Sequence, residues 1–221
     1  MFSKGYINTL LKKLGIKRKV KIFTTADPAR YHVKESPKEI YIYTSDKDFL
    51  SLAESLALCR LSEDDPLITR FDFHPDFPRN LKEKILNIIH PIKILWTAQL
   101  YRKCNINDLY TRLVKFSEFT LNAVVNQPNL KSVLNNIEHF SVLAEHFLII
   151  YDHLKNSNCE LLPQYLDKLL TSEDLKDLYI YLKYIDEKPS SEIYIKILNS
   201  FGIPVSFIEH NNRMVLSIQS T

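Results

Sequence analysis

The clearest pattern in the chain is a seven-residue echo between positions 133 and 155. An acid and a histidine stand side by side there three times, as Glu138-His139, Glu145-His146 and Asp152-His153. At 100° per residue the apolar residues share one helical face, with the acids on one side of it and the histidines on the other. These apolar residues are Val133, Ile137, Phe140, Ala144, Phe147, Tyr151 and Leu154. Val142 and Ile149 point away from that face, so the pattern predicts a central helix with neighbours on both sides.

Histidines seven residues apart do not make a metal site on one helix. Two turns separate them by about 10.5 Å, whereas ligands on one helix stand three or four residues apart because Zn–N bonds are about 2.0–2.1 Å. A shared ion would need ligands from another segment. Two interpretations of His139, His146 and His153 remain: a pH-sensitive contact with a partner helix, or a polar flank lying over apolar neighbours.

The first 78 residues alternate between helical and extended patterns. The residues predict a helix over 4–14, strands over 20–25 and 39–44, a helix from 45 to about 60 and a third strand over 67–73. Gly15 is expected to end the first helix, and Ser45 with Asp48 to cap the second. Pro75 and Pro78 break the third strand.

The remaining chain is mostly helical in pattern. Helices are predicted over 80–89, 91–101, 107–125, 133–155, from 163, over 171–185 and over 191–201. Pro91 is expected to separate the first two, Ser190 to cap the last, and Gly202 to end it. A hairpin over 203–209 and 214–219 follows, with Asn211-Asn212 at its tip.

These elements predict an α+β fold in which helix predominates. A small α-β-β-α part is expected over 1–78 and a helical part ending in a β-hairpin over 79–221, either as two parts or as a single compact domain. All strands could then join one small sheet. The segment 172–219 resembles a winged helix whose wing is the hairpin. Because the helix 191–201 offers only Lys196 as a cation, this winged-helix-like module is expected to contact protein rather than DNA.

Glycine is scarce, and its scarcity excludes several classes of site. The chain has only Gly5, Gly15 and Gly202, so a P-loop, a dinucleotide fingerprint and a nucleophile elbow cannot be built. No cofactor is expected. Hydrophobic residues at 45% can fill a core, and a net charge of +3 is too small to identify a nucleic-acid binder. Cys59, Cys104 and Cys159 lack metal-like spacing, which indicates an intracellular setting. No apolar run reaches the roughly 18 residues of a membrane span.

Basic residues dominate the start of the chain. Before the first acid, Asp27, come Lys4, Lys12, Lys13, Lys17, Arg18, Lys19 and Lys21. One interpretation is a mitochondrial import peptide, and otherwise a cytoplasmic or nuclear location is expected. The other interpretation is a nucleic-acid surface near Tyr6, formed by Lys12, Lys13, Lys17, Arg18, Lys19 and Lys21.

Two groups of acids are candidate metal ligands. Asp72 and His74, with Asp76 nearby, form a D-x-H pair that resembles the opening motif of metallophosphoesterases, although that family's later motifs are missing. Asp46 and Asp48 follow a strand, as do the Mg²⁺ or Mn²⁺ ligands of many glycosyltransferases, but the same acids also suit the first turn of a helix.

The order of the first elements is similar to the front half of zinc metallopeptidases. In that family the helix after the strands carries H-E-x-x-H. Here the corresponding residues 51–58 contain no histidine, so a shared scaffold would lack the metal.

The sequence favours a non-enzymatic intracellular subunit, adaptor or assembly factor that acts through protein contacts. A helical core with apolar groups on two faces supports packing against a protein partner. The first alternative is association with RNA or DNA through the basic start. The second is a metal-dependent hydrolase that uses Asp72 and His74.

Overall fold

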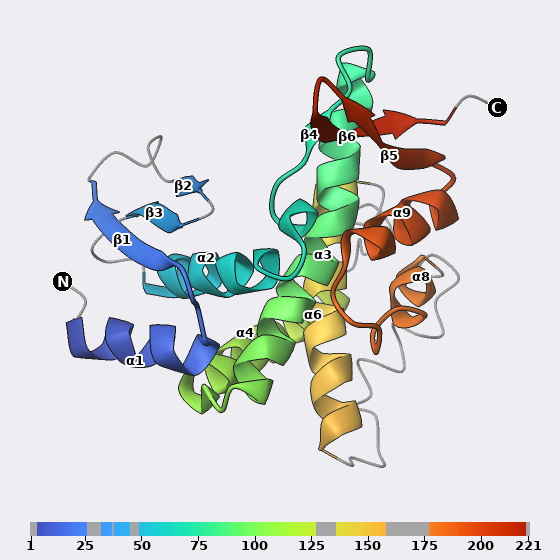
Figure 1. Cartoon of the computed structure of the whole chain (residues 1–221). Helices are drawn as coiled ribbons and strands as arrows, with labels where there is room; N and C mark the ends of the chain where they lie inside the picture. The colour runs from blue at the N-terminus through green and yellow to red at the C-terminus, as the bar shows by residue number, and fades with distance from the viewer. Residues whose placement is uncertain are drawn as a thin grey trace.

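A computed structural model describes residues 4–25, 32–36, 38–44, 49–126, 136–157 and 177–219. These residues form a predominantly helical α+β fold, which confirms the predicted class (Figure 1). Two long helices run side by side through the middle, one small sheet lies near the N-terminus and a second lies beside the C-terminus. None of the described helices combines the length and the apolar character that crossing a bilayer requires.

The N-terminal part contains one strand more than predicted. Its elements are α1 (Lys4–Leu14), β1 (Lys19–Thr24), β2 (His32–Glu35), β3 (Glu39–Thr44) and α2 (Phe49–Ser62). The helix 4–14 and the strand 39–44 are confirmed, whereas the predicted α-β-β-α order is wrong because β2 was missed. In this N-terminal sheet β3 is central, parallel to β1 and antiparallel to β2. Alternate β3 residues, Ile40, Ile42 and Thr44, are buried, and β3 packs against α2.

The predicted strand 67–73 is mostly absent. Residues Pro66–Ile68 instead form a 3₁₀ turn, η2, because the Asp65 carboxylate accepts a hydrogen bond from the Leu67 N–H at 3.0 Å. Only β4 (Asp72–Phe73) is extended there.

The prediction of a single sheet is also wrong. β4 pairs in parallel with β6 (Arg213–Ile218), which forms a hairpin with β5 (Val205–His210). The resulting C-terminal sheet has the order β4-β6-β5, separate from the N-terminal one. Asn211 and Asn212 have φ values of 51° and 61°, which confirms the predicted turn.

Pro91 does not divide the helix that contains it. One helix, α3 (Arg79–Lys103), continues through it, so the prediction of two helices is wrong. Proline lacks the N–H that would bond to the Asn87 carbonyl four residues earlier. The Ser141 hydroxyl donates to that carbonyl at 2.8 Å, and the Tyr181 hydroxyl donates to the neighbouring Ile88 carbonyl at 2.7 Å. Both donors come from other helices, so tertiary contacts compensate for the broken backbone ladder.

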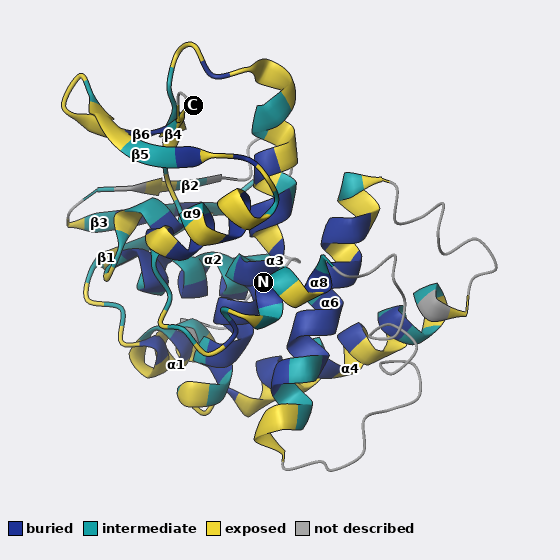
Figure 2. Cartoon of the chain, turned by 90° about the vertical axis from the view of Figure 1, so that its right-hand side faces the viewer, coloured by how far each residue is buried: buried dark blue, intermediate teal, exposed yellow. Residues whose placement is uncertain are grey.

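The helix α6 (Ile137–Asn156) turns two of the three acids of the seven-residue echo, Glu145 and Asp152, towards α3. The Glu145 carboxylate lies 3.4 Å from His90. The buried Asp152 carboxylate accepts from the Gln99 amide at 2.9 Å and pairs with Arg102 at 3.3 Å. The contact at the higher residue number on α3 is also the one at the higher residue number on α6, so α3 and α6 run parallel. The buried residues of α6 all lie between Phe140 and Asp152, in the middle of the helix (Figure 2), as predicted for a central helix.

The histidines of the echo face the other neighbour, α4 (Asn107–Val125). His146 is buried with its Nδ1 3.0 Å from the Ser117 hydroxyl, and the His153 Nδ1 lies 3.2 Å from the Tyr110 hydroxyl. His146 and His153 are seven residues apart on α6, and their partners Ser117 and Tyr110 are seven residues apart on α4 in the opposite order, so α4 and α6 are antiparallel and in register. His139, one repeat earlier, is exposed. The structure thus places His146 and His153 in the interface between α4 and α6, which we call the α4–α6 seam.

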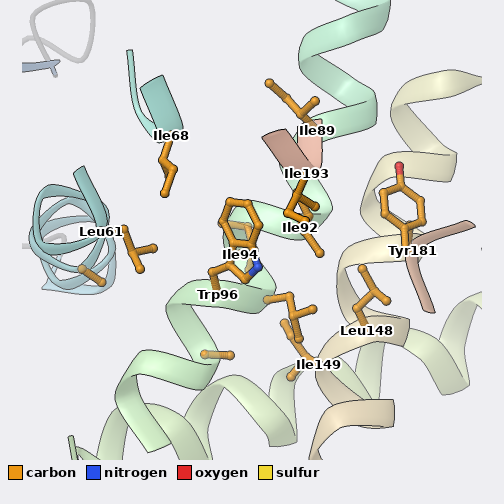
Figure 3. Packing of buried hydrophobic residues seen from close by; sticks show 14 of the residues in the cluster. Leu61, Ile68, Ile89, Ile92, Ile94, Trp96, Leu148, Ile149, Tyr181 and Ile193 are labelled. Atoms are coloured by element: carbon orange, nitrogen blue, oxygen red, sulfur yellow. The ribbon is translucent and has the colours of Figure 1, made fainter. Parts of the chain in front are cut away.

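The helices α8 (Leu178–Leu182) and α9 (Ser191–Ser200) close the core. Ser190 makes no side-chain cap. The Asp65 carboxylate instead accepts from the Ser191 N–H at 2.6 Å, where the helix dipole favours negative charge. Tyr194 donates to the Ile68 carbonyl at 2.8 Å, and its ring stacks 5.4 Å from that of Trp96. Figure 3 shows side chains of α3, α6, α8 and α9 in one apolar cluster, with Tyr181 of α8 farther from Trp96 than Ile193 of α9 is.

The winged-helix resemblance is not confirmed by these elements. Of the segment that carries it, residues 172–176 lie outside the described structure, as do 158–171 before them. The described part shows two helices, one of five residues, ahead of the hairpin.

The replacement Tyr181→Phe tests the tertiary hydrogen bond next to Pro91. It leaves the buried Ile88 carbonyl without this donor, so the free energy of unfolding should fall by about 1–3 kcal/mol. Urea unfolding measures the change. The matched control is Tyr184→Phe, whose hydroxyl makes an exposed 3.5 Å contact with Ser200 and should stay within about 0.5 kcal/mol of the wild type. Equal effects of the two variants would show that the hydrogen bond of Tyr181 does not stabilise this part of α3.

The buried histidine of the α4–α6 seam should make stability depend on pH. Burial lowers the pKa of His146 below its usual 6.5, so the unfolded chain binds a proton at a higher pH than the folded chain does. The free energy of unfolding should therefore fall as the pH drops through about 6.5 towards the folded-state pKa. His146→Gln should lose this part of the pH dependence, and exposed His139→Gln should retain it. Urea unfolding between about pH 7.5 and 5.5 measures both, and an unchanged profile in His146→Gln would refute the assignment.

Candidate nucleic-acid interface

One face of the N-terminal sheet packs on α2, and the opposite face carries aromatic and basic side chains. Residues directly paired across strands point to the same face, and the pairs here are Lys19 with Glu39, Lys21 with Tyr41, Phe23 with Tyr43 and Lys34 with Tyr41. We call this surface the open face. Its described residues are Lys19, Lys21, Phe23, Lys34, Glu39, Tyr41 and Tyr43, all exposed or half-buried.

Three aromatic rings stand together on the open face. The Phe23 ring lies 5.0 Å from that of Tyr43 and 6.3 Å from that of Tyr41, nearly parallel to both at 16° and 13°. Phe23 is 43% exposed, although a phenylalanine of the apolar core would be covered. The Phe23 ring therefore packs against two tyrosine rings and still keeps a large part of its surface exposed.

Lysines surround these rings. The Lys21 ammonium lies 4.9 Å from the centre of the Tyr41 ring, and that of Lys34 lies 5.8 Å from the centre of the Tyr43 ring. The side chain of Lys19 is 71% exposed at the start of β1. The open face thus combines aromatic rings with positive charges.

A single carboxylate among the described residues, that of Glu39, lies on the open face. It accepts a short hydrogen bond from the Tyr41 hydroxyl and pairs with Lys21 at 2.9 Å. The Tyr41 hydrogen bond and then the Lys21 ammonium lower the pKa of Glu39. Glu39 therefore stays ionised near neutral pH and offsets one of the three lysines.

The structure separates the six basic residues that the sequence grouped. Lys19 and Lys21 lie on the open face, while Lys12 is exposed on α1. Lys13, also on α1, donates to the Asn105 carbonyl at 2.7 Å. Lys17 lines a pocket at the end of the sheet.

Arg18 belongs to the internal structure. Its side chain is only 15% exposed and lies 3.4 Å from the Glu63 carboxylate. Its guanidinium donates to the Cys59 carbonyl at 2.7 Å and to the Ser62 hydroxyl at 2.9 Å. These contacts fasten the start of β1 to the end of α2.

Five members of the open face were not predicted from the sequence: Phe23, Lys34, Glu39, Tyr41 and Tyr43. Part of the signal was present, because strict alternation over 39–44 puts Glu39, Tyr41 and Tyr43 on one side of a strand. The pairing of this strand with β1 and β2, which adds Phe23 and Lys34, depends on tertiary structure.

The candidate metal ligands that the structure describes, Asp72, His74 and Asp76, do not form a metal site. Asp72 is exposed and 4.0 Å from Arg213. His74 lies 3.6 Å from Asp76, and its ring is 4.8 Å from that of His210. Asp46 and Asp48 fall outside the described residues. Within the part of the chain that is described, no three His, Cys, Asp or Glu side chains are placed to share a metal ion.

Comparisons with known proteins add no relative from which a function could be transferred. No family model matches this chain, and neither a curated protein nor a solved structure shows significant similarity to it. Its own geometry is therefore the basis for any functional assignment.

Proposed function

We propose that this chain binds single-stranded nucleic acid on the open face. The observation that supports this most directly is the exposed Phe23 ring between Tyr41 and Tyr43, bordered by lysines. Proteins that hold single strands without strong sequence preference combine aromatic platforms for bases with cations for phosphates. Bases inside a duplex are already stacked on each other, so these rings favour unpaired strands.

The interaction energies favour replacement of a lysine ammonium on a tyrosine ring by a nucleic-acid base. An exposed cation–π contact such as that of Lys34 with Tyr43 is worth about 0.5–1 kcal/mol. A base stacked on an aromatic side chain is worth about 1–3 kcal/mol. A base therefore displaces the ammonium from the ring, and the released lysine stays close enough to pair with a phosphate of the same strand.

The charge of the open face predicts moderate, salt-sensitive binding. Lys19, Lys21 and Lys34 can neutralise up to three phosphates, while Glu39 opposes them. Each neutralised phosphate of a single strand contributes about −0.7 to the slope of log affinity against log salt. The expected slope is then about −1.4 if Lys21 stays paired with Glu39 and about −2.1 if all three lysines contact phosphates.

The replacement Phe23→Ala tests the proposal. Loss of one stacked base should weaken binding about 5- to 100-fold, measured by fluorescence anisotropy with single-stranded DNA and RNA of about 12 nucleotides. The matched control is Phe119→Ala on α4, which removes a ring that is 73% exposed but far along the chain from the N-terminal sheet. Its affinity should equal that of the wild type.

Two outcomes would overturn the assignment. One is the absence of binding to either oligonucleotide at micromolar protein concentrations. The other is equal affinity of Phe23→Ala and Phe119→Ala, because the aromatic platform would then contribute nothing.

A protein-contacting subunit or adaptor is the second candidate function. It is supported by the exposure of Phe116 (60%) and Phe119 (73%) on α4 and of Val142 (46%) on α6, since exposed aromatic side chains are enriched at protein interfaces. A protein partner captured by the wild type should be lost from Phe119→Ala and kept by Phe23→Ala. Capture unaffected by Phe119→Ala would exclude α4 as the contact.

A further inference from the structure

A pocket of about 160 Å³ lies between the end of α2, the last two turns of α3 and the segment that leads into α9. A cavity of about 150 Å³ holds one benzene molecule, so a ligand of about six to eight non-hydrogen atoms fits here. A nucleotide is far larger, and no described residue of the open face lines this pocket. The described residues that line it are Leu61, Asp64, Trp96, Gln99, Leu100, Lys103, Lys188 and Pro189.

The most buried residue of this lining, Trp96, carries an unused hydrogen-bond donor. Trp96 is 1% exposed, and no residue that the structure describes accepts a hydrogen bond from its buried indole nitrogen. An indole N–H can only donate, and a buried donor without an acceptor costs free energy. The ring stacks on Tyr194, so packing rather than a hydrogen bond holds it in place. A ligand that supplies an acceptor atom would pair this donor.

Two lysines stand on the exposed side of the pocket. Lys103 ends α3 and Lys188 precedes α9, and both are exposed. Within the described part of the chain, neither ammonium group forms a hydrogen bond or an ion pair. An ammonium group, like the indole N–H, donates and does not accept. The pocket therefore presents one buried donor and two positive charges to the same small volume.

The acidic groups around the pocket are already matched by donors. The Asp64 carboxylate, which belongs to the lining, pairs with Arg60 at 3.2 Å. Gln99 is neutral, and its amide nitrogen donates at 2.9 Å to the Asp152 carboxylate, which pairs with Arg102 at 3.3 Å. Two carbonyls in the last turn of α2 accept from backbone N–H groups just beyond it. The described lining thus has an excess of positive charge and favours an anion.

We infer that this pocket, which we call the Trp96 pocket, binds a free short-chain carboxylate of about four carbons. One carboxylate oxygen accepts from the Trp96 indole N–H, and the ammonium groups of Lys103 and Lys188 pair with the other. The aliphatic chain lies against the apolar part of the lining, Leu61, Leu100 and Pro189. Inorganic phosphate has no apolar part, so these walls favour a carboxylate over phosphate. The site is independent of the open face and of nucleic-acid binding.

Butyrate is the probe that tests this site. Trp96 is the only tryptophan of the chain, so its single indole N–H resonance in an NMR spectrum reports the pocket directly. Butyrate should shift this resonance with a dissociation constant of about 0.1–1 mM. Butyramide has the same size without the charge, and it should bind about 10-fold more weakly. Inorganic phosphate should also bind more weakly than butyrate.

Replacement of the lysines separates a binding role from a structural one. Lys103→Gln and Lys188→Gln should each weaken butyrate binding about 3- to 30-fold and leave butyramide binding unchanged, because only the carboxylate pairs with the ammonium groups. The matched control is Lys183→Gln, an exposed lysine outside the lining, which should bind butyrate as the wild type does.

Four outcomes would overturn the inference. The first is an indole resonance that does not move at butyrate concentrations up to about 20 mM. The second is equal affinity for butyrate and butyramide, and the third is a butyrate affinity that survives both Lys103→Gln and Lys188→Gln. The fourth is tighter binding of phosphate than of butyrate, because the apolar walls would then contribute nothing.

Discussion

Pro91 removes the intrahelical hydrogen-bond donor of the Asn87 carbonyl. At this carbonyl the central helix α3 depends on a donor from the other central helix, α6. A proline inside a helix costs about 3 kcal/mol because a hydrogen bond is lost and the ring meets the preceding turn. The Ser141 hydroxyl replaces the missing donor from α6, and Tyr181 supports the next carbonyl. Burial of Pro91 with Ile88 and Ile92 adds apolar contact. With α3 continuous, one helix contacts α2, α4, α6 and α9.

The seven-residue echo of α6 places its two kinds of polar group against different neighbours. Glu145 and Asp152 meet His90, Gln99 and Arg102 of the parallel α3. On the other side, the histidines meet hydroxyls of the antiparallel α4. Buried polar groups that are unmatched cost free energy, so these pairs fix the register of three helices.

The open face exists because the apolar side of the N-terminal sheet is already covered. Ile40 and Ile42 are buried against the helical layer, so the alternate residues of each strand have no core to fill. They are aromatic and basic: Phe23 and two tyrosines, with lysines over the tyrosine rings. Arg18 meanwhile ties the start of β1 to the end of α2. The proposed binding surface is thus a direct consequence of how the sheet is supported.

Local pattern alone determined the fold class, α1, β3, α4 and the tip of the C-terminal hairpin. Each depends on side-chain periodicity or on nearby groups, such as Asn211 and Asn212 with their positive φ. Contacts distant in sequence decided the rest. Pro91 stays inside a helix because of hydroxyls 54 and 93 residues from the carbonyls they serve. Likewise, strand pairing gathered Phe23, Lys34 and the two tyrosines on one face. The sequence specifies which side chains a segment exposes on each of its faces. Tertiary packing decides which of these side chains contact each other, because residues from distant segments come together only when the core forms.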